Sequence, residues 1–266
     1  MSEPDRCLSY GGGVQSTAML LASCHGDIPS GEKPGVAIFA DTQWEPVAVT
    51  DHVRFMTEYA EKYGIEVVTI TKGSIRSNRG AMDIPLFTRD DAGNIGMTKR
   101  QCTDDYKIKP IRQELRKRLG YKPKQRLKDH IEMWLGISTD EAQRMKPSRE
   151  TNTVHRYPLI ELGWNRESCK RYIEKHDLPL PMKSSCIGCP YHSNRYFLDM
   201  KRERPEEWND VVAFDKQIRS GEFNFGKRGL RGAAYIHRTA QPLEDVYLNE
   251  DQIELFGEEC SGYCEA

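Results

Sequence analysis

The sequence lacks any apolar run long enough to cross a membrane. No stretch approaches the roughly 18 consecutive apolar residues of a transmembrane helix, and residues 1–6 have neither the charged segment nor the apolar core of a signal peptide. A charge excess is missing as well, since 39 basic and 40 acidic residues leave a net charge of −1. Composition therefore gives no general basic field for nucleic acid, and we expect a cytoplasmic protein without a membrane partner.

Two common phosphate-binding motifs are also absent. The chain has no Gly-Lys-Ser/Thr of a Walker A loop, and no G-x-G-x-x-G with an acidic residue about 20 positions later. It has instead three consecutive glycines between a β-prone run and an apolar helical run. Glycines let the backbone approach a ligand, and a helix start presents N–H groups to an anion. An ordinary glycine turn is the alternative. The candidate phosphate-binding residues here are Gly11, Gly12, Gly13, Gln15, Ser16 and Thr17.

Apolar periodicity predicts an α/β fold. The first part of the chain alternates strand 6–10, helix 15–25, strand 35–41, helix 47–63 and strand 66–71, and residues 132–137 form a fourth strand. This alternation predicts a parallel sheet with helices on both faces. Ligands of such folds bind at the carboxyl ends of the strands, where the glycine loop, Asp41 and Thr42 are expected.

The remainder of the chain is expected to be less regular. Residues 72–100 are interpreted as a loop, and residues 156–160 as a short extended segment. Further helices are expected over 111–119, over 140–145 with Ser138 as its cap and Glu141 at the capping-box position, over 165–175 with Asn165 as its cap, and over 205–219. We divide the chain into a nucleotide-binding domain, 1–180, and a cysteine-bearing helical extension, 181–266.

Eight cysteines make metal or redox chemistry a candidate, because a disulfide framework is not expected in a reducing cytosol. Cys186 and Cys189 form a C-x-x-C knuckle between small or turn-forming residues. Such a knuckle needs further ligands. A structural zinc site completed by Cys260 and Cys264, or by His192, is one possibility.

The glycine loop resembles the PP-loop of ATP pyrophosphatases, whose usual pattern is Ser-Gly-Gly-x-Asp-Ser. Gly11 stands at the first serine of that pattern and Gln15 at the aspartate. The phosphoadenosine phosphosulfate (PAPS) reductase branch of the superfamily also departs from the strict pattern, so the differences favour that branch. The amide of Gln15 can donate a hydrogen bond to a phosphate, which an ionised aspartate cannot.

Two strand ends carry further resemblances to this superfamily. The segment beginning with Asp41 and Thr42 is similar to its Thr-Gly…Pro-Glu-Thr segment, which lies near the nucleotide. The segment containing Gly136 is similar to its Gly-x-Arg-x-x-Glu/Asp-Ser strand end, without the arginine. Arg144 and Arg149 are the candidates to supply the missing positive charge.

The cysteine segments resemble PAPS and adenylylsulfate reductases. Their arginine–cysteine–lysine–proline motif is matched around Cys102 and Lys107, with Gln101 where cluster-bearing reductases have a second adjacent cysteine. Near the C-terminus, Cys260 follows a glutamate as in the catalytic Glu-Cys-Gly-x-His motif, although the later positions differ. With Cys264 it forms a candidate catalytic redox pair, unless both are thiols of a frayed tail.

Over roughly residues 6–192 the chain resembles the PAPS reductase-like family of the PP-loop superfamily. The resemblance implies an adenine nucleotide, ATP or PAPS, with Mg²⁺, and a [4Fe–4S] cluster on Cys102, Cys186 and Cys189, with zinc as the alternative. It implies PAPS reduction with a thioredoxin-like partner, or ATP-dependent sulfur transfer from a sulfur donor protein to tRNA or DNA. A non-catalytic, zinc-stabilised nucleotide-binding subunit is the third possibility.

Overall fold

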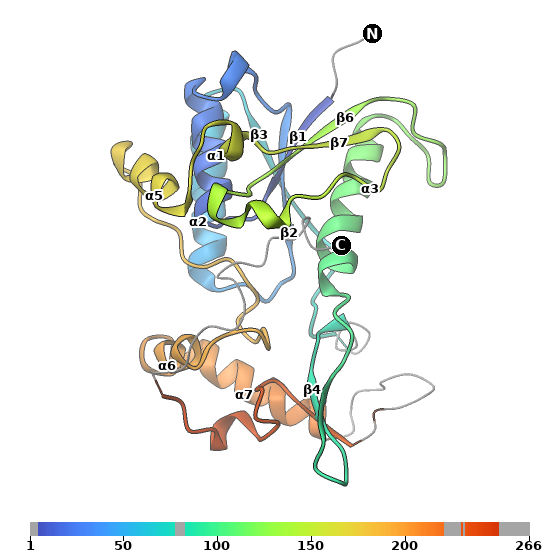
Figure 1. The fold of residues 1–266 in the computed structure, drawn as a ribbon, viewed down its shortest axis with the longest axis vertical. Helices are drawn as coiled ribbons and strands as arrows, with labels where there is room; N and C mark the ends of the chain where they lie inside the picture. Colours follow the sequence, from blue (N-terminus) through green and yellow to red (C-terminus); the bar gives the residue numbers. More distant parts are fainter. Residues whose placement is uncertain (1–4, 78–82, 221–229, 231, 250–266) are drawn as a thin grey trace.

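The protein is described by a computed structural model that covers residues 5–77, 83–220, 230 and 232–249. A five-stranded sheet forms the larger half of the molecule, and a smaller layer containing α6 and α7 lies beyond one end of it (Figure 1). The sheet order is β3-β2-β1-β6-β7, and every neighbouring pair is parallel. Its strands are β1 (Asp5–Tyr10), β2 (Val36–Asp41), β3 (Glu66–Thr71), β6 (Ile131–Leu135) and β7 (Thr153–Arg156).

Helices cover both faces of this sheet, which confirms the predicted fold class. Side chains of a strand alternate between the two faces. Leu8 and Tyr10 therefore join the core beneath α1, α2 and α5, whereas Cys7 joins the core beneath α3. The covering helices are α1 (Val14–His25), α2 (Val47–Glu61), α5 (Arg166–Lys175) and, on the opposite face, α3 (Lys109–Arg118).

A second, antiparallel sheet of order β5-β4-β8 lies in the smaller layer. Two of its strands come from the segment predicted as loop, 72–100, so that prediction was wrong there. Three-residue strands are too short to show periodicity, and β4 pairs with a strand far along the chain. Trp44 and Tyr106 join the core of this layer, so the boundary at residue 180 stays a prediction. Its elements are β4 (Phe87–Arg89), β5 (Ile95–Met97), α6 (Asn194–Glu203), α7 (Pro205–Arg219) and β8 (Ala233–Tyr235).

The structure allows the predicted helix caps and short segments to be compared with the observed ones. Asn165 caps α5 as expected, because its side chain accepts a hydrogen bond from the Ser168 N–H at 2.8 Å. The capping box at Ser138 was wrong, since Ser138 makes no side-chain cap bond to the 3-10 segment η4 (Thr139–Arg144). The expected extended segment was also partly wrong: β7 ends at its first residue, and α4 (Pro158–Glu161) follows, with proline in its first turn. Helix α6 was not predicted from the sequence.

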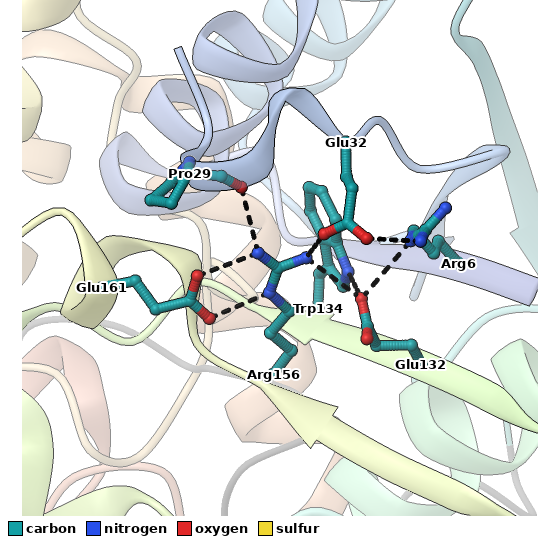
Figure 2. Close-up of polar contacts among 7 residues, drawn as sticks. All are labelled: Arg6, Pro29, Glu32, Glu132, Trp134, Arg156 and Glu161. Carbon is teal, nitrogen blue, oxygen red and sulfur yellow. Dashed lines mark hydrogen bonds and ion pairs between the residues drawn. The ribbon is translucent and has the colours of Figure 1, made fainter. Parts of the chain in front are cut away.

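A network of ion pairs joins β1, β6 and β7 on the α1 side of the sheet (Figure 2). Arg156 forms a bidentate pair with Glu161, both distances being 2.9 Å, and also pairs with Glu32 and Glu132. Its guanidinium lies over the Trp134 ring, 4.9 Å from the centroid. The carboxylates raise the pKa of Arg156 further above its usual value. No helix in the described ranges is both long and apolar enough to cross a membrane.

Candidate functional site

The glycine loop follows β1 and leads directly into α1. Gly12 has a left-handed φ of 75°, and a Cβ on it would lie 3.0 Å from the Val53 side chain, so only glycine fits there without strain. The Thr17 N–H closes the first helical hydrogen bond on the Gly13 carbonyl at 2.9 Å. Within the described residues, the N–H groups of residues 12–16 donate to no other backbone atom outside helices and strands. They remain available to an anion at the helix N-terminus.

The end of β6 closes over this loop. A Cβ on Gly136 would lie 3.1 Å from the Ser16 nitrogen, so glycine allows the two segments to touch. The sequence placed Gly136 and Ser16 in separate motifs, and the structure brings them together. The contact lies where the chain order switches sides of the sheet, between β1 and β6, which is where parallel α/β folds bind ligands.

Gln15 is fixed by side chains that follow β6. It is almost fully buried, with 1% of its surface exposed. Its Nε2 donates to Glu141 at 3.3 Å, and its Oε1 accepts from Arg166 at 3.0 Å. Glu141 in turn accepts a hydrogen bond from Arg144 at 2.6 Å. The amide N–H that was expected to reach a phosphate thus already has a partner, and its phosphate contact stays a prediction.

Three buried donor atoms beside this group have no hydrogen-bond partner in the described part of the chain. They are the Ser138 hydroxyl and the Nε and Nη2 atoms of Arg144. Ser138 is fully buried, and the Arg144 side chain is 16% exposed. Buried donors are normally hydrogen-bonded. An anion bound at the loop would meet this need, so Arg144 retains its candidate role.

The hydroxyls in the first turn of α1 form hydrogen bonds within the protein. The Ser16 hydroxyl donates to the Gly13 carbonyl at 3.2 Å. Thr17 is fully buried, and its hydroxyl lies 3.0 Å from His52 Nε2 and 3.4 Å from the Tyr10 hydroxyl. Burial lowers the pKa of His52 to about 4, so the ring is neutral near pH 7. Thr17 therefore braces the helix start from within the core.

The three cysteines predicted as metal ligands line one pocket. Its volume is about 450 Å³, part of it open to solvent. Cys102 comes from the segment before α3, whereas Cys186 and Cys189 come from the knuckle before α6. Thr42 and Lys107, two predicted nucleotide-site residues, line it too. We call it the thiol pocket; its lining also includes Trp44, Ile75, Ile84, Pro85, Arg100, Thr103, Gly188, Pro190 and Tyr191.

An ion pair lies beside the knuckle. Lys107 Nζ is 3.3 Å from Glu45 Oε1, and the Glu45 side chain is fully buried. Glu45 Oε2 has no hydrogen-bond partner among the described residues. The Thr42 hydroxyl lies 3.1 Å from the Cys186 sulfur. Burial, together with the Glu45 charge, raises the pKa of the Cys186 thiol well above its ordinary value, while Lys107 opposes the shift.

One short segment links the thiol pocket to the glycine loop. The Ser184 hydroxyl donates to the Gly11 carbonyl, and Cys186 follows two residues later. Consecutive Cα atoms are about 3.8 Å apart, so these two Cα atoms lie within about 8 Å. The knuckle is anchored on its other side by a 2.8 Å bond from the Ile187 N–H to the Trp44 carbonyl. The knuckle is therefore anchored next to the glycine loop.

The three cysteines are the type of ligand that an iron–sulfur cluster requires, because such clusters are held by cysteine thiolates. The described residues contain no group of three or more His, Cys, Asp or Glu side chains gathered around a single metal ion. His192 is not gathered with the thiols; its Nε2 lies 2.9 Å from the Cys186 carbonyl, and its ring stacks on Tyr196. Cys260 and Cys264 lie outside the described residues.

Several site residues escaped the sequence analysis. Glu45, Glu141, Ser184 and Arg166 had no assigned role in the site, yet each holds a predicted site residue in place. Glu45 lies only three positions after Thr42, so the strand-end segment carried a signal for it. The remaining contacts connect parts of the chain too distant for any local pattern. Asp41 ends β2, and its carboxylate accepts the Gln43 N–H at 2.7 Å.

These features define a parallel α/β protein with a glycine-rich anion loop at the switch point of its sheet. No family model and no curated protein matches the chain. Among solved structures it is similar to the PAPS reductase of Candida auris, at 15% identity over 68% of this chain and 76% of that one, with a TM-score of 0.42. It is also similar to the U34-tRNA thiolase NcsA of Methanococcus maripaludis with its [4Fe–4S] cluster, at 13% identity over 90% and 81%, with a TM-score of 0.45.

Proposed function

We propose that this protein is a PAPS reductase-like PP-loop enzyme of sulfur metabolism. It binds an adenine nucleotide at the glycine loop, next to an iron–sulfur cluster in the thiol pocket. The observation that carries the proposal is the hydrogen bond from Ser184 to Gly11, two residues before Cys186. It ties a candidate cluster ligand to the anion loop, so a sulfur-handling group and a nucleotide phosphate would be neighbours.

The nucleotide phosphates would bind at the N-terminus of α1. The N–H groups of residues 12–16, which have no backbone partner outside helices and strands among the described residues, and the positive end of the helix favour negative charge there. The free nitrogen atoms of Arg144 and the hydroxyl of Ser138 are further donors. Donors held in place before the reaction stabilise charge that develops on a departing phosphate. Mg²⁺ would accompany ATP and neutralise part of its charge.

The cluster would be held by Cys102, Cys186 and Cys189 as thiolates. Thiolates are soft ligands, which favours iron–sulfur clusters or zinc over magnesium or calcium. When bound, the cluster supplies a site for sulfur or for electrons. Burial of the knuckle and the Glu45 charge raise the pKa of the Cys186 thiol, and the positive charge of Lys107 opposes this shift and favours the thiolate. The six described cysteines form no disulfide, in keeping with the reducing cytoplasm we propose for this protein.

Two reactions suit this arrangement. In PAPS reduction, a thiolate of a dithiol, supplied by the Cys260–Cys264 pair or a thioredoxin-like partner, attacks the sulfate sulfur and displaces adenosine 3′,5′-bisphosphate. The second thiol then releases sulfite and leaves a disulfide. In sulfur transfer, ATP adenylates an oxygen of the acceptor and releases pyrophosphate, and sulfur from a donor then displaces AMP. Gln101 is an argument for the alternative, sulfur transfer. Cluster-bearing reductases have two adjacent cysteines in this segment, whereas this chain has Gln101 and therefore only one cluster ligand there.

Product analysis on anaerobically purified protein separates these possibilities. We expect ATP or PAPS to bind in calorimetry, and sulfite to form from PAPS when a dithiol is supplied. Pyrophosphate from ATP without sulfite from PAPS would replace the reductase by the sulfurtransferase. Binding without either product would favour a non-catalytic subunit, and absence of binding to both nucleotides would overturn the proposal. The Arg144→Met variant should bind nucleotide less tightly, whereas Arg54→Met on the exposed side of α2 serves as the control.

A further inference from the structure

We infer that α3 and the segment after it form a surface that binds the phosphate backbone of a polynucleotide. As a statement about substrate class this rests on the sulfur-transfer alternative of the proposed function, although the binding itself does not. Nine of the 20 residues 109–128 are lysine or arginine, and one is acidic. This stretch carries a charge of +8 in a chain of net charge −1, so the other residues together carry −9. The positive charge is thus concentrated on one part of the fold.

The charges at the far end of this stretch are not neutralised by the protein. On α3 itself, Lys117 and Arg118 form ion pairs with Glu114, and Lys109 pairs with preceding aspartates. After the helix, four exposed basic side chains form no ion pair with any described acidic residue. They are Lys122, Lys124, Arg126 and Lys128.

Hydrogen bonds hold this segment in a defined conformation. The Tyr121 hydroxyl accepts the Lys128 N–H at 3.0 Å, and the Gln125 side chain accepts the Lys122 N–H at 3.0 Å. The Arg116 guanidinium donates to the Gln125 carbonyl. The backbone that carries the lysines is therefore fixed before a ligand binds, which reduces the entropy lost on binding.

A second pocket extends this surface beside α3. Its volume is about 520 Å³, part of it open to solvent, and its lining includes Arg112, Lys146, Arg149 and Tyr157. Arg112 is paired with Glu150. Lys146 and Arg149 are exposed and have no ion pair within the described ranges. They add two positive charges to this surface. We call residues 109–128 with Lys146 and Arg149 the basic face.

The basic face begins at the wall of the thiol pocket. The π-helical turn η3 (Asp104–Ile108) separates the two pockets: Lys107 lines the thiol pocket, whereas Asp104 and Ile108 line the basic one. Helix α3 follows η3 directly and its ten residues span about 15 Å. A duplex rises about 3.4 Å per base pair along its axis, so that length corresponds to about four base pairs. A strand on this face would bring a nucleotide to the rim of the thiol pocket.

The surface fits a polynucleotide better than an anionic membrane. A membrane-binding segment adds apolar side chains to its basic ones. The exposed large apolar residues of the described structure all lie outside residues 109–128. Charge alone, arranged along a helix, is what a phosphate backbone requires.

Fluorescence anisotropy with a labelled single-stranded oligonucleotide tests this inference on the full-length protein. The variant Lys122→Glu/Lys124→Glu/Arg126→Glu should bind at least about tenfold more weakly. Loss of three phosphate contacts should also reduce the slope of log K against log salt by about 2 between about 50 and 200 mM. The matched control is Lys62→Glu/Arg171→Glu/Lys175→Glu, with the same charge change on exposed residues of α2 and α5. This control should keep the wild-type affinity for the oligonucleotide and the wild-type slope of log K against log salt.

Equal binding by both triple variants, or no binding by the wild type, would overturn the inference. Binding to phosphatidylserine vesicles without binding to oligonucleotides would overturn it as well. Parallel titrations with single-stranded RNA, single-stranded DNA and duplex DNA identify which nucleic acid fits best. None of these measurements needs nucleotide or iron, so a failure of the proposed function would leave their outcome unchanged.

Discussion

Two polar clusters of the parallel sheet differ in how their groups are paired. On the α1 side of the sheet, Arg156 at the end of β7 has carboxylate or carbonyl partners for Nε and both Nη atoms (Figure 2). Around the glycine loop and the cysteine knuckle, Glu45 Oε2, the Ser138 hydroxyl and Arg144 Nη2 are buried, and none has a hydrogen-bond partner in the described residues. Because buried polar groups are normally paired, we expect the Arg156 cluster to contribute stability and the second cluster to meet a ligand.

The largest expected effect is in the Arg156 cluster. Arg156→Met removes the cation that three carboxylates share, and should lower the free energy of unfolding by about 3 kcal/mol. Urea denaturation measures this loss. Arg54→Met is the control: its ion pair with Asp51 is 71% and 57% exposed, and such pairs contribute at most about 1 kcal/mol. Nucleotide affinity should stay unchanged in both. Equal losses in the two variants would contradict a special role for the network.

Acid should destabilise the protein through buried histidines. Burial lowers the pKa of His52 and of His237 to about 4 in the folded state. Since the unfolded chain takes up these protons near pH 6.5, stability is complete above that pH and falls as pH drops towards 4. Two such groups give a slope of up to about 2.7 kcal/mol per pH unit. Urea midpoints at several pH values measure it.

The variant His52→Gln removes one of these protonation sites. It should lower stability at neutral pH, because the bond to Thr17 is changed, and should also reduce the slope between about pH 6 and 4 by up to half. An unchanged slope would show that His52 is not the group that titrates.

A substitution in the glycine loop should affect both stability and binding. Gly12→Ala forces a positive φ on alanine and crowds Val53, so we expect a loss of about 1–3 kcal/mol and weaker nucleotide binding. Gly11→Ala is the matched control, since its Cβ would meet only the Ser16 hydroxyl at 3.7 Å. Denaturation and calorimetry measure the two effects. Similar losses at both glycines would argue against the loop geometry.

The smallest effect on stability, and the most telling, is expected at Ser138. Ser138→Ala removes a buried hydroxyl without a described partner, so stability should stay the same or rise by up to about 1 kcal/mol. Nucleotide affinity should fall several-fold, because a donor to the phosphate is lost. A clear loss of stability with unchanged affinity would show that the hydroxyl serves the fold and not a ligand.

Local patterns were enough to predict β1, β2, β3 and β6, the glycine loop and the fold class. The apolar run of β2 and the three glycines after β1 can each be recognised from a few neighbouring residues. Contacts between distant parts of the chain could not be predicted. Gln15 meets Glu141 across 126 positions and Thr42 meets Cys186 across 144. The motif resemblance grouped three cysteines, and the structure shows why they share a pocket: the knuckle is held against β2 by Trp44 and Thr42.

Iron and zinc counts on anaerobically purified protein test the central claim most directly, namely that the three thiols of the pocket hold a cluster beside the anion loop. Wild type should contain iron with absorbance near ~400 nm, typical of thiolate-bound clusters. Cys102→Ala and Cys186→Ala should lose it. Cys24→Ala, a change in the core beneath α1, should keep it. Zinc without iron in the wild type, or full iron content in Cys102→Ala, would contradict the account.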